Sequence, residues 1–379
     1  MFHRKLAPPT ETTLLLGPRA TGKSTWLEQV LPSATRFDLL DTRLARDLAA
    51  DPSRFAREVE ALPGGAWVVV DEVQKVPALL DEVHRLDGKR GRRFVLSGSS
   101  ARKLKRGGAN LLAGRAIRRD FFPLVSAEVG EATPLERVTF GSLPRVFSLK
   151  RPHAYLESYV DTYLREEVQA EALTRNIGGF SRFLEVAARQ NGQVTNVSNI
   201  ARDAQVARPT VQGYFDVLVD TLLGFWLPAW KLKPGTKLVA HPKFFFFDPG
   251  VARTLTRRLS YPPTPEEFGT LLETHLLHEL RAYLSYSELN YPISYFRTHD
   301  DVEADVVLET QKGFVALEFK ASDDWRNSFN SGFKRLRDAL PNVTCIGVFT
   351  GERAQKGDGY TVMPYPKFLE ALWEGQLIR

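Results

Sequence analysis

The glycine-rich segment GPRATGKST constrains the fold more than any other part of the chain. An apolar run at residues 12–16 precedes it, and a pattern with helical spacing at residues 26–31 follows it. Gly17 and the run Gly22-Lys23-Ser24 satisfy the spacing G-x-x-x-x-G-K-[ST]. The order of strand, loop and helix lets successive backbone N–H groups surround phosphates at a helix N-terminus. The segment therefore predicts a site for the phosphates of ATP.

Each position of this loop has an expected part in binding. The Lys23 amine can reach the terminal phosphates, and the Ser24 hydroxyl is expected to ligate Mg²⁺. The alternative is a glycine turn that binds nothing. The residues expected to contact the nucleotide are Gly17, Pro18, Arg19, Ala20, Thr21, Gly22, Lys23, Ser24, Thr25 and, from a later strand, Ser97.

A second apolar run, residues 67–70, ends in Asp71 and Glu72. An uninterrupted apolar strand suits a parallel sheet that is buried on both faces, and ligands bind beyond the carboxyl ends of such strands. Asp71 is therefore expected to hold Mg²⁺ together with Ser24, and Glu72 to polarise the attacking water. The alternative is that both acids only stabilise a helix N-terminus.

A third strand, expected at residues 93–96, ends in the sequence SGSS. Ser97 or Ser99 would then lie beside the strand of Asp71 and contact the γ-phosphate or the attacking water. An ordinary serine-glycine turn explains either serine equally well.

Basic residues gather in three groups, at positions 89–93, 102–106 and 115–119, in a chain with a formal charge of +6. Clustered charge of this kind can meet a polyanion, although a solvated surface is the alternative for each group. Arg115 follows a glycine near the expected nucleotide edge. It is the first candidate for a catalytic arginine that neutralises transition-state charge, in the same chain or in a neighbouring subunit, with Arg118 and Arg119 as alternatives.

The middle of the chain has a winged-helix pattern. A helix at about residues 198–203 precedes a tight turn and a second helix that starts at Pro209, a favoured position for proline. Two strands, at residues 225–232 and 237–247, would follow. In this arrangement the second helix reads DNA, although such modules also serve as protein–protein contacts. The residues expected to contact DNA are Arg208, Thr210, Gln212, Lys231 and Lys233.

Near the carboxyl end, acidic residues occur on a predicted helix and two predicted strands. Glu273 lies among leucines on a helix at residues 265–285, Asp305 on one strand, and Glu318 and Lys320 on the next. Residues two apart on a strand share a face, so Glu318 and Lys320 point together. Glu273, Asp305 and Glu318 are the expected Mg²⁺ ligands, while Glu318 and Lys320 are the expected catalytic pair for phosphodiester cleavage. The alternative is a surface hairpin with Glu–Lys pairs.

Two histidines on the same predicted helix, His275 and His278, lie at a spacing that shares one face. They lack further soft ligands nearby. We therefore expect them on the helix surface rather than at a zinc ion.

Together, these segments resemble a family of prokaryotic ATPases of the AAA+ superfamily that carry a carboxy-terminal domain of unknown function with a restriction-endonuclease-like core. The resemblance covers nearly the whole chain and includes LSGSS, LLAGR, FFPL and FFFFDPGVAR. It implies binding of ATP and Mg²⁺ at the phosphate loop, Asp71 and Glu72. It also implies a PD-(D/E)XK-type site at Glu273, Asp305, Glu318 and Lys320. It also implies a homo-oligomer, since AAA+ enzymes usually complete each ATP site with a neighbour's arginine.

The expected fold is α/β, in three domains. Residues 1–130 would form an AAA+ P-loop ATPase domain with a parallel sheet, residues 131–260 a helical and winged-helix domain, and residues 261–379 a restriction-endonuclease-like α/β domain. The single cysteine excludes an internal disulfide framework and fits a reducing compartment, and no apolar stretch has the length of a membrane span. We therefore expect a cytoplasmic protein without a membrane partner.

Three hypotheses follow for the function. The first is an ATP-hydrolysing, DNA-processing protein whose carboxy-terminal domain cuts or grips the phosphodiester backbone, with magnesium at a nuclease site. The second is a nucleotide-operated switch or scaffold in which the endonuclease-like domain does not cleave. The third is a motor that remodels proteins, whose hydrolysis rate DNA would leave unchanged.

Overall fold

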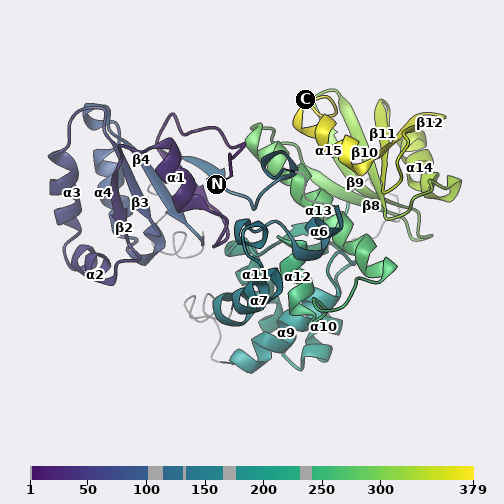
Figure 1. Ribbon diagram of the computed structural model, residues 1–379, viewed down its shortest axis with the longest axis horizontal. Coiled ribbons are helices and arrows are strands. Elements are labelled where there is room, and N and C mark those ends of the chain that lie inside the picture. The colour runs from purple at the N-terminus through teal and green to yellow at the C-terminus, as the bar shows by residue number, and fades with distance from the viewer. Residues whose placement is uncertain (1, 101–113, 131–133, 165–175, 231–240) are drawn as a thin grey trace. The chain divides into compact units, whose positions relative to one another are not determined.

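The computed structural model describes residues 2–100, 114–130, 134–164, 176–230 and 241–379 (Figure 1). The chain divides into two compact units, one of residues 1–124 with 216–223 and one of residues 125–215 with 224–379. The middle and carboxy-terminal segments thus share one unit, and their division near residue 260 stays a prediction. Among the helices that the structure describes, none combines the length and the apolar character that a membrane span requires.

The first unit contains a five-stranded parallel sheet with the order β2-β3-β4-β1-β5. Because β4 lies between β1 and β3, the carboxyl ends of these three strands meet at one edge of the sheet. That edge is where a parallel sheet binds ligands. The strands are β1 (Thr13–Leu16), β2 (Thr35–Asp38), β3 (Trp67–Asp71), β4 (Arg93–Gly98) and β5 (Ile117–Asp120).

Helices return the chain between these parallel strands. A buried cluster that includes Phe55, Val70, Leu79 and Phe94 packs the α3 and α4 helices against the sheet. The helical segments are α1 (Lys23–Val30), α2 (Thr42–Ala50), α3 (Pro52–Glu60), η1 (Val73–Lys75), α4 (Leu79–Leu86) and η2 (Lys89–Gly91).

The second unit begins with a helical region and a pair of antiparallel strands. Helix α10, a short turn, helix α11 and the strands β6 and β7 follow the predicted order, but the strands are shorter than predicted. The elements are η4 (Ser126–Glu128), α6 (Pro134–Phe140), η5 (Pro144–Phe147), α7 (Pro152–Ser158), η6 (Tyr159–Leu164), α9 (Ile177–Arg189), α10 (Val197–Ala204), α11 (Arg208–Asp220), β6 (Gly224–Leu227), β7 (Lys243–Phe246) and α12 (Pro249–Leu255). The end of α11, from residue 216 on, belongs to the first unit.

The segment FFFFDPGVAR acts as a structural joint. Asp248 is fully buried and caps α12, since its Oδ1 accepts a hydrogen bond from the Val251 N–H at 3.0 Å. Its Oδ2 accepts the Ser142 N–H at 2.6 Å, which ties the end of α6 to α12. A side chain at Gly250 would place its Cβ 2.1 Å from the Phe140 carbonyl oxygen, so the two backbones can approach only with glycine there.

The carboxy-terminal part of this unit is a six-stranded mixed sheet with the order β12-β13-β11-β10-β9-β8. Strands β10, β11 and β13 run parallel, whereas β8, β9 and β12 pair antiparallel to their neighbours. The elements are α13 (Pro265–Tyr286), β8 (Ile293–Arg297), β9 (Glu303–Thr310), β10 (Gly313–Lys320), η7 (Asn327–Asn330), α14 (Ser331–Ala339), β11 (Val343–Phe349), β12 (Gln355–Gly357), β13 (Tyr360–Pro364) and α15 (Tyr365–Trp373).

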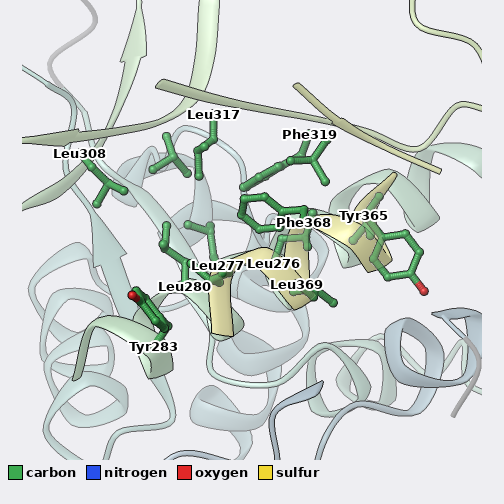
Figure 2. Packing of buried hydrophobic residues seen from close by; sticks show 14 of the residues in the cluster. Leu276, Leu277, Leu280, Tyr283, Leu308, Leu317, Phe319, Tyr365, Phe368 and Leu369 are labelled. Carbon is green, nitrogen blue, oxygen red and sulfur yellow. The ribbon is translucent and has the colours of Figure 1, made fainter. Parts of the chain in front are cut away.

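Helices cover both faces of this sheet. On one face, Leu276 and Leu280 of α13 and Phe368 of α15 pack against Leu308 of β9 and Leu317 of β10 (Figure 2). On the other face, Phe333 and Leu336 of α14 pack against Ala316 and Val307. The predicted fold class is therefore confirmed as α/β, with an amino-terminal parallel sheet, a helical middle and a carboxy-terminal sheet.

Candidate functional site

The phosphate loop connects β1 to α1 through two glycines with separate roles. A Cβ at Gly17 would lie 2.2 Å from the Phe121 carbonyl oxygen, so the loop can start only with a bare backbone. Gly22 has a φ of 93° at the N-cap of α1, in the left-handed region that glycine adopts without strain. The Lys23 amine donates hydrogen bonds to the Gly17 and Pro18 carbonyl oxygens at 2.7 and 3.0 Å. The lysine is 5% exposed, and its amine is held against the loop backbone.

The carboxylate of Asp71, at the end of β3, is shared by two hydroxyl groups. Ser24 of α1 donates a hydrogen bond to Asp71 Oδ2, and Ser97 of β4 donates one to Asp71 Oδ1. The structure therefore brings together the three residues that the sequence placed at the Mg²⁺ and γ-phosphate position. Hydroxyl and carboxylate oxygens suit a hard cation, so Ser24 and Asp71 fit Mg²⁺.

Glu72 follows Asp71 in an unusual backbone conformation. Its φ is 57° and its ψ is 43°, in the left-handed region that costs about 1 kcal/mol or more and persists where the surroundings require it. The side chain is 7% exposed, and burial raises its pKa, while Lys23 and Arg19 oppose the rise. Gln74 donates a hydrogen bond to Glu72 Oε2 and another to Ser99 Oγ at 3.1 Å. The carboxylate is thus held in place by Gln74 of η1 and by Ser99, the residue that follows β4.

Arg4 supports the loop from a position that sequence reasoning missed. Its guanidinium is buried and donates to the Thr21 carbonyl oxygen at 2.8 Å and to the Phe122 carbonyl oxygen at 2.6 Å. It also lies 4.1 Å from the centre of the Phe121 ring. These contacts fix the loop to the chain after β5. A single arginine in an amino-terminal segment carries no pattern that could have identified it.

Arg115 lies at the other edge of the sheet from the phosphate loop. It precedes β5, whose first residue pairs with Thr13 at the start of β1, and its guanidinium donates to the His84 carbonyl oxygen near the end of α4 at 2.7 Å. The structure therefore does not bring Arg115 to the phosphate loop of its own chain. A role in a neighbouring subunit stays a prediction.

The basic residues of the three groups differ in their surroundings, and some of them serve the fold. Arg92 is buried and donates to the carbonyl oxygens of Glu60 and Leu62, so it serves the fold. Arg119 donates to the Ala7 carbonyl oxygen, and Arg118 pairs with Asp120. The group at residues 102–106 lies outside the described residues.

Of the residues predicted to contact DNA, three lie on a described helix and two do not lie in the described ranges. Arg208, Thr210 and Gln212 are exposed on α11. Lys231 and Lys233, expected on the wing, lie outside the described residues.

The carboxy-terminal acidic residues meet where β9 and β10 separate. The β9–β10 pairing ends at Leu317 opposite Val306, and beyond it Asp305 Oδ2 accepts the Phe319 N–H at 2.7 Å. Lys320 contacts Glu318 Oε1 and lies 3.9 Å from Asp305 Oδ2. Glu318 and Lys320 therefore point together. Glu318 is buried, and its Oε2 accepts no hydrogen bond from the residues that the structure describes.

Lys243 of β7 joins this group and was not predicted. Its amine lies 3.2 Å from Glu273 Oε1 and 2.6 Å from Glu303 Oε1. Arg297 of β8 approaches the other oxygen of Glu303 at 3.4 Å. A cleft of about 230 Å³ is lined by these side chains together with Gly192 and Gln193. We call it the carboxylate cleft; its ionisable residues are Glu273, Glu303, Asp305, Glu318, Lys243, Lys320 and Arg297.

Burial and crowding shift the titration of these groups. Burial raises the pKa of Glu273 to about 7, with Lys243 opposing the rise and Asp305 adding to it. Burial also raises the pKa of Glu318, and Asp305 adds to the effect. Burial lowers the pKa of Lys243, but Glu273, Asp305 and Glu303 raise it by more, so the amine stays protonated.

The predicted magnesium ligands of this cleft are not assembled as a metal site. Within the described ranges, no three histidine, cysteine, aspartate or glutamate side chains are placed to hold a metal ion. Glu273 instead faces the Lys243 amine, and Glu318 faces the Lys320 amine. In this arrangement the Lys243 amine contacts one oxygen of Glu273, and the Lys320 amine contacts one oxygen of Glu318 and lies 3.9 Å from Asp305 Oδ2, so a divalent cation would compete with both amines; magnesium binding by these three acids stays a prediction.

The expectation of surface histidines on α13 was wrong. His275 and His278 are 1% and 2% exposed, since α13 is covered on more than one side. Burial lowers the pKa of His275 well below its ordinary value, so the ring is neutral. A helix with apolar residues on all sides is buried nearly all round, and the prediction did not take this into account.

Comparison with known proteins identifies the amino-terminal segment. Residues 9–130 match the family model of the AAA domain. This segment is therefore similar to an AAA-type P-loop ATPase domain. Residues 134–261 and 268–368 match two further models, each described as a domain of unknown function (DUF8612 and DUF4143). Those descriptions leave the restriction-endonuclease-like core a prediction.

Two relatives of this chain are uncharacterized proteins of Mycobacterium bovis and Mycobacterium tuberculosis. Each is 27% identical over 341 residues, which are 87% of this chain and 74% of the relative. Both therefore extend beyond the ATPase domain into the carboxy-terminal part.

Solved structures give weaker likenesses. A Walker-type ATPase of Pyrococcus abyssi is 17% identical, with a TM-score of 0.43 over 65% of this chain and 91% of that one. The Aeropyrum pernix ORC1 protein, solved in complex with DNA, is 13% identical, with a TM-score of 0.30 over 66% and 86%. At these scores the likeness establishes neither a fold nor a function.

Proposed function

We propose that the protein hydrolyses ATP with Mg²⁺ at the edge of the ATPase-domain sheet and couples this reaction to DNA. The observation that carries the first part is the convergence of Ser24 and Ser97 on the Asp71 carboxylate, beside Lys23 and Glu72. Phosphoryl transfer needs groups that position the reactants and neutralise charge. The oxygens of these side chains and the Lys23 ammonium group can supply both.

The side chains would divide the work as follows. Lys23, released from the loop carbonyls, would bind the terminal phosphates, and Ser24 with Asp71 would hold the metal. When bound, Mg²⁺ neutralises charge that develops on the phosphate oxygens. Glu72, fixed beside Asp71, would orient the attacking water and take its proton.

DNA is the proposed partner because of the exposed polar residues that begin α11. A helix that follows α10 and a short turn can present Arg208, Thr210 and Gln212 to a phosphate backbone or a base edge. The formal charge of +6 favours a polyanionic partner. A homo-oligomer is proposed with it, in which Arg115 of one subunit serves the ATP site of another.

Replacing Arg208 by alanine should weaken DNA binding several-fold and reduce the slope of log affinity against log salt by about one, because one phosphate contact is lost. Fluorescence anisotropy with a labelled duplex over a salt series measures both quantities. Arg353→Ala removes an exposed arginine between β11 and β12 and serves as the control. An unchanged slope in Arg208→Ala would remove α11 from the DNA interface.

For the carboxylate cleft, the second hypothesis is favoured over a nuclease. The observation behind this choice is that ammonium groups of Lys243 and Lys320 neutralise the acids that would hold the metal. We therefore propose that this part binds a partner or a DNA structure without cutting it.

The native chain should leave linear, branched and single-stranded DNA intact in Mg²⁺ or Mn²⁺, with or without ATP, because the Lys243 and Lys320 ammonium groups compete with a metal ion for the acids of the cleft. Glu318→Ala should give the same result and the same rate of ATP hydrolysis. Gel analysis of the DNA and phosphate release measure the two. A nick made by the native chain and lost in Glu318→Ala would establish the nuclease instead.

A further inference from the structure

Lys243 holds a position that lysine seldom takes. It begins β7, ahead of a run of phenylalanines, and is 4% exposed. A buried ammonium is stable only when carboxylates and hydrogen bonds compensate the lost hydration. Glu273 of α13 and Glu303 of β9 supply this compensation at 3.2 and 2.6 Å, and the Tyr295 ring centre lies 5.2 Å away. Lys243 thus joins three elements around one charge.

The charges in the cleft are nearly balanced by the protein itself. Its lining holds four carboxylates and three cations, a formal charge of −1. A divalent ion added to this set would leave a buried excess of positive charge, which is costly at low dielectric. Without the Lys243 amine the formal charge becomes −2, which a divalent ion neutralises. The Oε2 atom of Glu318, buried without a hydrogen bond from the described residues, is then an available ligand.

We propose that Lys243 is a resident cation that takes the place of a divalent ion in the carboxylate cleft. The native chain then binds no Mn²⁺ there below millimolar concentration, and a chain without this amine does. The proposal deepens the non-cleaving role given to the cleft. It does not depend on ATP hydrolysis or DNA binding, so either of those can fail while this result stands.

The test uses Mn²⁺ alone, in the full chain and without nucleotide. An Asp71→Asn background removes the carboxylate of the ATPase site. Electron paramagnetic resonance of free Mn²⁺ should show none bound in this background and one ion per chain after Lys243→Gln is added. Adding Glu318→Gln should abolish the new site. Lys312→Gln, in the exposed turn between β9 and β10, is the matched control and should create no site.

Two results would overturn the proposal. One is Mn²⁺ bound by the Asp71→Asn chain below millimolar concentration and lost on Glu318→Gln, since Lys243 would then exclude nothing. The other is a folded Lys243→Gln chain that binds no ion. If Lys243→Gln unfolds the chain, circular dichroism in EDTA and in Mn²⁺ measures whether the ion restores the fold. Refolding by Mn²⁺ supports the proposal, because binding then supplies folding energy, and a chain unfolded in both conditions contradicts it.

Discussion

Lys23→Ala should lower kcat/KM for ATP hydrolysis by about a thousandfold. The amine is the only part of this side chain that can meet the terminal phosphates, and the structure already holds it at the phosphate loop through the Gly17 and Pro18 carbonyl oxygens. Alanine keeps the helix, because the backbone of α1 does not use the amine. Phosphate release over a range of ATP concentrations at saturating Mg²⁺ measures kcat/KM, and calorimetry measures the affinity for nucleotide.

The control for this prediction is Lys89→Ala. Lys89 is exposed in η2, next to the amino end of β4, whereas the phosphate loop lies at the carboxyl edge of the sheet. Its removal changes the net charge equally and should leave hydrolysis unaltered. Turnover in Lys23→Ala close to that of the native chain would place the hydrolytic site elsewhere.

Glu72→Gln should retain ATP binding and lower kcat by about a hundredfold or more, the usual share of a general base. Glutamine keeps the shape and the hydrogen bonds with Gln74 and Ser99, but it cannot accept the proton of the attacking water. Single-turnover assays separate this chemical step from binding. Glu60→Gln, at the exposed end of α3, is the control.

The pH dependence provides a second measurement of the same residue. The carboxylate acts only when ionised, so the rate falls as the pH drops through its pKa. Because burial raises the pKa of Glu72, the loss should begin at a higher pH than an exposed glutamate would give. In Glu72→Gln the acid limb should disappear from the remaining activity. Equal profiles for the two chains would exclude Glu72 as the base.

The meeting of Ser24, Asp71 and Ser97 could be predicted from the sequence because these residues follow strands in fixed order. Apolar runs ending at Asp71 and Ser97 indicate neighbouring parallel strands, and their carboxyl ends must meet at one edge. Local spacing thus specified a long-range contact. Arg115 shows the limit of this reasoning. The glycine before it did not indicate whether the arginine lies at the amino or the carboxyl end of β5.

The carboxylate cleft was predicted in part. Period-two spacing placed Glu318 with Lys320, and the same rule applied to Glu303 and Asp305 would have found the second acid of β9. Lys243 could not be paired with Glu273 from the sequence, because thirty residues separate them and the partner of a buried charge depends on tertiary packing. The lysine beside four phenylalanines was nevertheless a signal, since such a neighbourhood demands a counter-charge.

Cutting the chain at residue 261 to study its last part alone would alter the chemistry of that part. Such a fragment would keep Glu273 and Glu303 and lose β7, which brings the ammonium between them. Affinity for calcium, manganese or lanthanide ions seen in the fragment would then be an artefact of the cut. Work on the intact polypeptide avoids that error.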